Sequence, residues 1–122
     1  MTSMNTNQPK RGEIWLVNFD PTLGVEIKKT RPGVVISSDS IGVLPLKLVA
    51  PLTEWKEKFS KMIWQVQIEP NKENGLRKNS SIDVLQIRSL DTTRLTQFIG
   101  RISSDKMKEV CLALADIVEA ID

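Results

Sequence analysis

Apolar positions in the first half of the chain recur with the spacing of strands. Residues 13–19 (EIWLVNF) form a nearly continuous apolar run, which predicts a strand buried on both faces. Residues 33–37 and 47–53 predict two more strands. Pro51 in the latter indicates a sheet edge or a bulge, because proline cannot donate to a strand ladder. Residues 62–68 alternate apolar and polar positions with a period of two, as in a half-exposed strand.

The second half of the chain predicts further strands and then a helix. Residues 81–90 and 95–102 have strand character, and residues 91–94 between them can form one helical turn. Apolar residues then recur at helical spacing after Ser104, the predicted N-cap, with Asp105 in the first turn where it suits the helix dipole. The pattern therefore predicts a mainly β (α+β) fold, a strongly bent antiparallel sheet of five to seven strands with one C-terminal α-helix.

The length and composition of the chain fit one such domain. The 122 residues are 40% hydrophobic and 26% charged, which is ordinary for a globular protein of this size. We expect a disordered polar tail at residues 1–9 and a single domain at residues 10–122. The tail lacks the apolar centre of a signal peptide, and no later stretch is long enough to span a bilayer. We therefore expect a cytoplasmic protein without a membrane partner.

Charge is distributed unevenly, although the net charge is only +2. Acidic residues dominate the predicted C-terminal helix, whereas basic residues gather in four segments. These segments are residues 28–31, 56–61, 72–78 and 88–101. A basic face would suit a nucleic-acid partner, but an ordinary solvated surface explains the same clusters equally well.

The residue types that the chain lacks restrict its chemistry. There is no His and no Tyr, and Cys111 is the single cysteine. We therefore expect no metal site, no internal disulfide and no cofactor. Cys111 has no His to activate it, so it is interpreted as a packing residue of the helix. Any catalysis must rest on carboxylates, guanidinium groups and hydroxyls.

The polar loop between the first two predicted strands carries one group of candidate residues. Arg31 offers a planar fork of donors that matches a phosphate, and Pro32 fixes its direction at the start of a buried strand. Glu26 could act as a general base, while Lys28 and Lys29 could follow a nucleic-acid backbone. Taken singly, each residue is at least as compatible with a solvated loop.

A second group of candidates lies on later segments. Thr53 ends a predicted strand, where a hydroxyl can donate to a developing oxyanion or cap a turn. Trp55 follows, and its indole could stack a base or belong to the core. Gln86 and Arg88 fall on one face of the predicted strand at residues 81–90, a face that they share with apolar residues.

Short blocks of sequence follow one another in a characteristic order. They are Gly12-Glu13-Ile14-Trp15, Phe19-Asp20-Pro21, Gly24, Glu26, Arg31-Pro32, Val34-Val35-Ile36, Pro51-Leu52-Thr53, Gly75-Leu76, Ser80-Ser81, Gln86-Ile87-Arg88 and Leu90-Asp91. This order resembles the MazF/PemK family of toxin endoribonucleases, the Kid-type toxins, over nearly the whole chain. The resemblance implies a compact SH3-like barrel, a homodimer, and metal-independent cleavage of single-stranded RNA. It also implies a MazE-like antitoxin whose C-terminal segment blocks the RNA groove.

The resemblance also implies roles for individual residues. By position, Arg31 and Thr53 match the family's catalytic arginine and threonine, and Glu26 matches a loop acid that is important in some members. Gln86 and Arg88 match strand residues near the RNA path. The loop departs from the family pattern between residues 25 and 30, where Val, Ile and two Lys replace small or polar residues. The RNA motif that is read is therefore left open, as are the cognate antitoxin and the physiological trigger.

The reaction expected without a metal or a His is transesterification. The neighbouring 2′-hydroxyl attacks the scissile phosphate and gives a 2′,3′-cyclic phosphate and a 5′-hydroxyl, so that DNA is not a substrate. Arg31 and Thr53 would neutralise charge on the phosphate oxygens. Arginine is a poor proton acceptor, so the base is either Glu26 or the 2′-hydroxyl working through bound water.

Two other classes of protein remain as alternatives. The gyrase-binding CcdB-type toxins resemble this family in fold but cleave nothing, and they rely on aromatic or acidic residues at the end of the last helix. Here that helix ends in residues 118–122 (VEAID), without a terminal Trp. A purely structural or antitoxin-like SH3-type module has no need for Arg31 beside Thr53. A homodimer is also favoured by apolar surface, since residues 13–19 and the helix offer more than one small domain covers.

Overall fold

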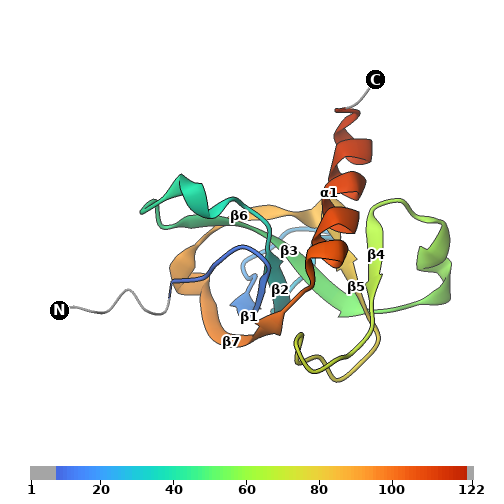
Figure 1. The fold of residues 1–122 in the computed structure, drawn as a ribbon, viewed down its shortest axis with the longest axis horizontal. Helices are drawn as coiled ribbons and strands as arrows, with labels where there is room; N and C mark the ends of the chain where they lie inside the picture. Colours follow the sequence, from blue (N-terminus) through green and yellow to red (C-terminus); the bar gives the residue numbers. More distant parts are fainter. Residues whose placement is uncertain (1–7, 121–122) are drawn as a thin grey trace.

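The computed structural model describes residues 8–120 as a bent antiparallel sheet followed by one helix (Figure 1). The strands are β1 (Glu13–Asn18), β2 (Thr30–Val35), β3 (Leu46–Glu54), β4 (Gln65–Ile68), β5 (Ser80–Asp83), β6 (Arg88–Asp91) and β7 (Leu95–Arg101), and the helix is α1 (Ser104–Val118). Short 3₁₀ turns connect them, namely η2 (Asp39–Ile41), η3 (Glu57–Lys61), η4 (Val84–Gln86) and η5 (Thr92–Arg94). The predicted tail falls mostly on residues 1–7, which lie outside the described residues, as do residues 121–122. No helix within residues 8–120 is long and apolar enough to cross a bilayer.

The strands pair in the order β4-β5-β3-β2-β1-β7, and β6 pairs with β3 beside this path. The seven strands and the C-terminal helix confirm the predicted fold class. Closure into a barrel is not found: within the described residues no pairing joins β4 to β7, so both ends of the path stay open. The sheet bends because β3 pairs with β6 over its first half and with β5 over its last three residues.

The central position of β3 corrects the prediction for Pro51. This proline lies opposite Gly33 of β2 and is buried, rather than at a sheet edge or in a bulge. On the other side of β3, pairing with β6 ends at Val49 and pairing with β5 begins at Leu52. The missing N–H of Pro51 therefore falls between two ladders and interrupts neither.

The predicted strand at residues 81–90 is also wrong, because it is two strands separated by η4. β5 ends at Asp83, whose Oδ1 accepts a hydrogen bond from the backbone N–H of Gln86 at 3.3 Å and so caps η4. β6 then starts at Arg88. Gln86 and Arg88 consequently do not share one strand face. The helical turn predicted at residues 91–94 is confirmed as η5.

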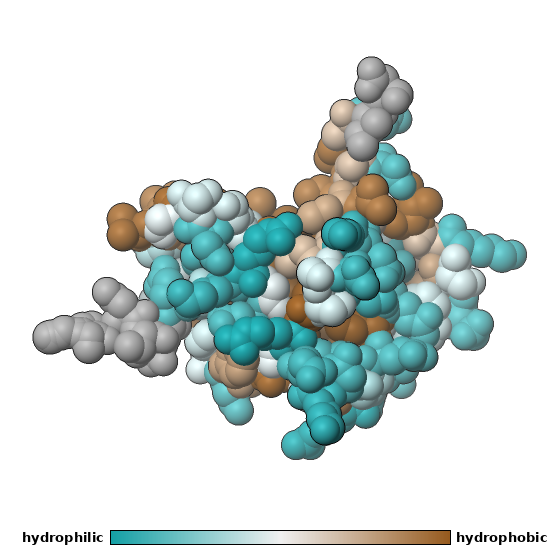
Figure 2. Space-filling model, in the orientation of Figure 1, coloured by the Kyte–Doolittle hydropathy of each residue, from teal (hydrophilic) through white to brown (hydrophobic). Residues whose placement is uncertain are grey.

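The sheet buries apolar side chains on both faces. Neighbouring residues of a strand point to opposite faces, so Ile14 and Val34 belong to one cluster while Trp15 and Val35 belong to the other. Helix α1 adds three buried residues to the first cluster, which are Met107, Val110 and Ala113. Apolar surface remains along α1, above a face covered mostly by hydrophilic residues (Figure 2).

Helix α1 begins one residue earlier than its predicted cap implies. The N-cap is Ser103, whose Oγ accepts a hydrogen bond from the N–H of Lys106 at 3.0 Å. Cys111, expected to be a packing residue, is exposed, and its Sγ lies 3.3 Å from Nη2 of Arg11. It lies at the edge of the buried stripe rather than within it.

Candidate functional site

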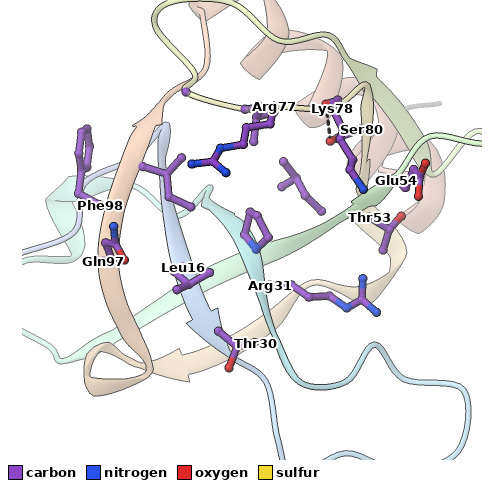
Figure 3. A pocket seen from close by; sticks show the side chains of 15 residues that line it. Leu16, Thr30, Arg31, Thr53, Glu54, Arg77, Lys78, Ser80, Gln97 and Phe98 are labelled. Carbon is purple, nitrogen blue, oxygen red and sulfur yellow. Dashed lines mark hydrogen bonds between the residues drawn. The ribbon is translucent and has the colours of Figure 1, made fainter.

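A groove of about 750 Å³ opens between the sheet and the loop of residues 71–79 (Figure 3). Strands β1, β2, β3 and β7, the loop and the first residue of β5 all contribute lining residues. The polar lining includes Arg31, Thr53, Glu54, Arg77 and Lys78. The lining thus carries three positively charged side chains against one carboxylate, together with three hydroxyls, an arrangement suited to a polyanion.

Arg31 and Thr53 line the same groove although 22 positions separate them in the sequence. Arg31 is the second residue of β2, opposite Val17 of β1, and Thr53 is the penultimate residue of the neighbouring strand β3. Nε of Arg31 donates to the carbonyl oxygen of Lys28 at 3.0 Å, which fixes the direction of the guanidinium. Figure 3 shows both side chains at one end of the groove.

The loop of residues 19–29 carries Glu26, Lys28 and Lys29, none of which lines the groove. Its ends are joined by hydrogen bonds: the N–H of Phe19 donates to the carbonyl of Lys29 at 3.0 Å, and the N–H of Lys29 donates to Asp20 Oδ1 at 3.0 Å. The carboxylate of Glu26 accepts from the N–H of Leu23 at 2.7 Å. The loop is therefore a folded turn beside the groove.

Gln86 and Arg88 also lie outside the groove lining, and both hold this loop. Oε1 of Gln86 accepts from the N–H of Ile27 at 2.7 Å. Nη1 of Arg88 donates to the carbonyl of Phe19 at 2.7 Å, and its guanidinium lies 6.0 Å from the centre of the Phe19 ring. These contacts place the two residues beneath the loop rather than on the groove wall.

Trp55 stands apart from the groove as well. It is half-buried, its Nε1 donates to Glu57 Oε2 at 3.3 Å, and its ring packs edge-on against Phe59 with centroids 5.8 Å apart. Both contacts of the indole are thus with residues of η3 and not with the groove.

Sequence reasoning missed Arg77 and Lys78 as individual site residues. The available signal was the basic segment at residues 72–78, which could be recognised as a cluster but not placed against Arg31. Both side chains are exposed, and both extend into the groove from the side opposite Arg31 (Figure 3).

Asp83, the last residue of β5, carries a buried carboxylate. Asp83 is almost fully buried, and burial raises its pKa above the ordinary value, although hydrogen bonds from Gln65 and Gln86 oppose the shift. Asp83 does not line the groove. Within residues 8–120, no group of three or more His, Cys, Asp or Glu side chains is placed to hold a metal ion.

Comparison with known protein families gives a match over most of the chain. Residues 10–118 match the family described as PemK-like, MazF-like toxin of type II toxin-antitoxin system. Endoribonuclease MazF9 of Mycobacterium tuberculosis is 34% identical over 111 residues, which cover 86% of this chain and 92% of that protein.

Solved structures with the same fold include a MazF from Deinococcus radiodurans. It is 25% identical, with a TM-score of 0.76, and the match covers 91% of this chain and 96% of that chain. A mycobacterial endoribonuclease in complex with its cognate antitoxin is 16% identical, with a TM-score of 0.74 and coverage of 93% and 98%. The open seven-stranded sheet with its C-terminal helix is thus a known architecture.

Proposed function

The chain belongs to the PemK-like, MazF-like family of toxins of type II toxin-antitoxin systems, and on that premise we propose that it is an endoribonuclease acting on single-stranded RNA. The observation that carries this proposal is the presence of Arg31 and Thr53 in one groove whose other wall carries Arg77 and Lys78. A positively charged groove of this kind can follow the backbone of a single strand. The 34%-identical relative, an endoribonuclease, supports the same reading.

The proposed reaction is an attack of the ribose 2′-hydroxyl on the adjacent phosphorus. A bond forms between O2′ and phosphorus, the bond from phosphorus to O5′ breaks, and the products are a 2′,3′-cyclic phosphate and a 5′-hydroxyl. The guanidinium of Arg31 and the hydroxyl of Thr53 donate hydrogen bonds to the non-bridging oxygens, where negative charge grows. Loss of one such preorganised donor commonly costs on the order of 100-fold in rate.

The proton of the 2′-hydroxyl needs an acceptor, and the departing O5′ takes a proton from water in the open groove. We propose Glu26, the carboxylate of the adjacent loop, as the acceptor, which requires the loop to carry it to the bound RNA, because Glu26 does not line the groove and its carboxylate accepts from the N–H of Leu23. Glu54 lines the groove beside Thr53 and is the natural comparison, because it is the next residue on β3. Variants of the two carboxylates separate these assignments.

The same scheme needs no metal ion. Arg31, Arg77 and Lys78 supply the positive charge that a divalent cation would otherwise bring to the phosphate. Their charge would also oppose binding of a cation in the same groove. We therefore propose cleavage that persists in the presence of a chelator.

We propose a homodimer and a cognate antitoxin as the protein partners. The mycobacterial relative was solved with its antitoxin, and a cationic groove suits an acidic antitoxin segment that competes with RNA. The exposed apolar residues Leu112 and Val118 of α1 are surface that a second copy could cover.

The function is tested by incubating the purified protein with a single-stranded RNA in the presence and absence of EDTA. We expect cleavage in both conditions, with cyclic phosphate and 5′-hydroxyl ends identified by mass spectrometry. The Arg31→Ala variant, compared at equal folded concentration, should leave the RNA intact. An RNA that the wild-type protein leaves whole, or cleaves only with added magnesium, would contradict the proposal.

A further inference from the structure

The loop of residues 71–79 is a wall of the groove to which the proposed reaction gives only a general positive charge, without separate contacts for its two cations. It connects β4 to β5 and carries Arg77 and Lys78, both exposed and both lining the groove. Neither side chain is needed for the sheet or the core. Because both side chains face Arg31 across the groove, a ligand that spans the groove can contact all three.

The loop is built around the buried side chain of Asn74. Its Oδ1 accepts hydrogen bonds from the N–H groups of Asn71 and Leu76, each at 3.0 Å, and its Nδ2 donates to the carbonyl of Glu69 at 2.8 Å. Asn74 is 1% exposed. One side chain thus satisfies three backbone groups and fixes the path of the loop.

The loop is also held tightly against β7. Gly75 has a φ of +67°, and a Cβ at this position would lie 2.5 Å from the carbonyl oxygen of Ile99. A Cβ on Gly100 would lie 2.5 Å from the carbonyl oxygen of Asn74, and the N–H of Arg101 donates to the carbonyl of Glu73 at 2.7 Å. The backbone that carries Arg77 and Lys78 is therefore fixed before any ligand arrives, which lowers the entropic cost of binding.

The two cations of the loop face different surroundings. Arg77 points into the groove (Figure 3), and the groove lining includes the apolar residues Leu16, Pro32 and Ile99. Lys78 extends toward the end of the groove where Arg31 and Thr53 lie, as the same view shows. A planar guanidinium above an apolar surface suits a nucleobase, whereas an ammonium suits a phosphate.

We propose that Arg77 holds one base of the RNA between its guanidinium and the apolar lining of the groove, while Lys78 contacts the phosphate bound by Arg31 and Thr53. The rigid loop thereby sets how the strand lies across the reacting groups. This inference rests on the proposed function, because it names the subsites that the same groove offers to the nucleotide beside the cleaved bond.

The test uses a single-stranded RNA that the wild-type protein cleaves at one position, with 2′-deoxyribose at that position to prevent cleavage. Affinities are measured for Arg77→Ala, Arg77→Lys and Lys78→Gln across a salt series. Lys72→Gln is the matched control, since Lys72 is exposed on the same loop but does not line the groove. Thermal unfolding of each variant verifies that the fold is retained.

We expect both Arg77 variants to bind about 10-fold more weakly, because stacking on a base is lost even where the charge is kept. Removing the base beside the cleaved position should weaken wild-type binding by a similar factor, and should weaken binding by Arg77→Ala no further. Lys78→Gln should lower the slope of log affinity against log salt by about 0.7, the contribution of one phosphate contact to a single strand. Lys72→Gln should change neither quantity.

Other outcomes overturn the inference. RNA binding that is unchanged in Arg77→Ala excludes the base subsite, and a salt slope that is unchanged in Lys78→Gln excludes the phosphate contact. A wild-type protein that binds the unmodified RNA but does not cleave it refutes the proposed function, and leaves the binding comparison of the variants in force. A wild-type protein that binds no RNA refutes both.

Discussion

The side-chain oxygen of Gln86 accepts a hydrogen bond from the backbone N–H of Ile27 at 2.7 Å, and thereby ties η4 to the loop of residues 19–29. Arg88 ties the start of the same loop through the carbonyl of Phe19. Two residues expected on the RNA path thus hold the loop that carries Glu26. A substitution at either position should act first on the loop, and only through it on the groove.

Replacing Gln86 by Ala should loosen this loop. The N–H of Ile27 loses its partner, at a cost of about 1 kcal/mol, and amide exchange at Ile27 should accelerate. Hydrogen exchange measured by NMR checks this, with Gln97→Ala as the control, because Gln97 lines the groove and its side chain makes no hydrogen bond to the loop. Unchanged exchange at Ile27 would show that the tether does not hold the loop in solution.

The assignment of the base predicts different cleavage rates for two carboxylate variants. Glu26→Gln should lose most of the activity, because an amide cannot take the proton of the 2′-hydroxyl. Glu54→Gln should keep most of the activity, since Glu54 lines the groove but is not assigned the proton. Single-turnover cleavage rates measure both effects. If Glu54→Gln loses the activity instead, Glu54 is the base.

The raised pKa of Asp83 predicts how the stability of the fold depends on pH. Burial raises the pKa of its carboxyl in the folded protein above the ordinary value of 3.8, so the folded state binds the proton more tightly than the unfolded state. Its stabilising contribution is complete below 3.8 and is lost as the pH rises through the raised value. Asp83→Asn cannot ionise, so the stability of this variant relative to wild type should increase over that pH range.

Urea unfolding of wild type and Asp83→Asn at several pH values measures this difference. A difference that is constant with pH, or that changes in favour of the wild type as the pH rises, would contradict the assignment. Asp91, exposed and with its pKa lowered by hydrogen bonds from Thr93, titrates in the opposite direction and is present in both proteins. It therefore cancels in the comparison.

Within the loop of residues 71–79, Asn74 should be the position at which a substitution lowers stability most. Asn74→Ala removes the partners of the N–H groups of Asn71 and Leu76 and of the carbonyl of Glu69, at a cost of about 2 to 4 kcal/mol in the free energy of unfolding. Asn79→Ala, an exposed asparagine of the same loop, should cost less than about 0.5 kcal/mol. Equal costs for the two variants would mean that the Asn74 network does not stabilise the loop.

Local sequence patterns predicted much of this fold, because strand alternation and helical spacing depend on nearby residues. The start of α1 was placed within one residue, and η5 at its correct segment. The error at residues 81–90 has a local cause, since the Asp83 side chain that caps η4 turns an apparently continuous strand into two. Pro51 was misplaced for a non-local reason, namely that β3 changes partners there.

The site residues likewise include some that the sequence identified and some that it could not. The resemblance to a family singled out Arg31 and Thr53, and the structure brings them into one groove. Arg77 and Lys78 could not be placed, because their position depends on contacts between the loop and β7, such as that of Gly75 with Ile99. Glu26 was expected at the groove, yet its carboxylate is bonded within its own loop. Contacts between distant segments, such as that of Gly75 with Ile99, leave no periodic signal in the sequence.

The central claim is that Arg31 and Thr53 promote attack by a 2′-hydroxyl. The most direct measurement replaces the single ribose at the cleaved position of an RNA substrate by 2′-deoxyribose and follows cleavage by the wild-type protein. We predict that the substituted RNA stays intact while the all-ribose RNA is cleaved, and that Arg31→Ala and Thr53→Val each slow the latter by about 100-fold or more. Cleavage of the 2′-deoxy RNA at the same position and rate would contradict the account.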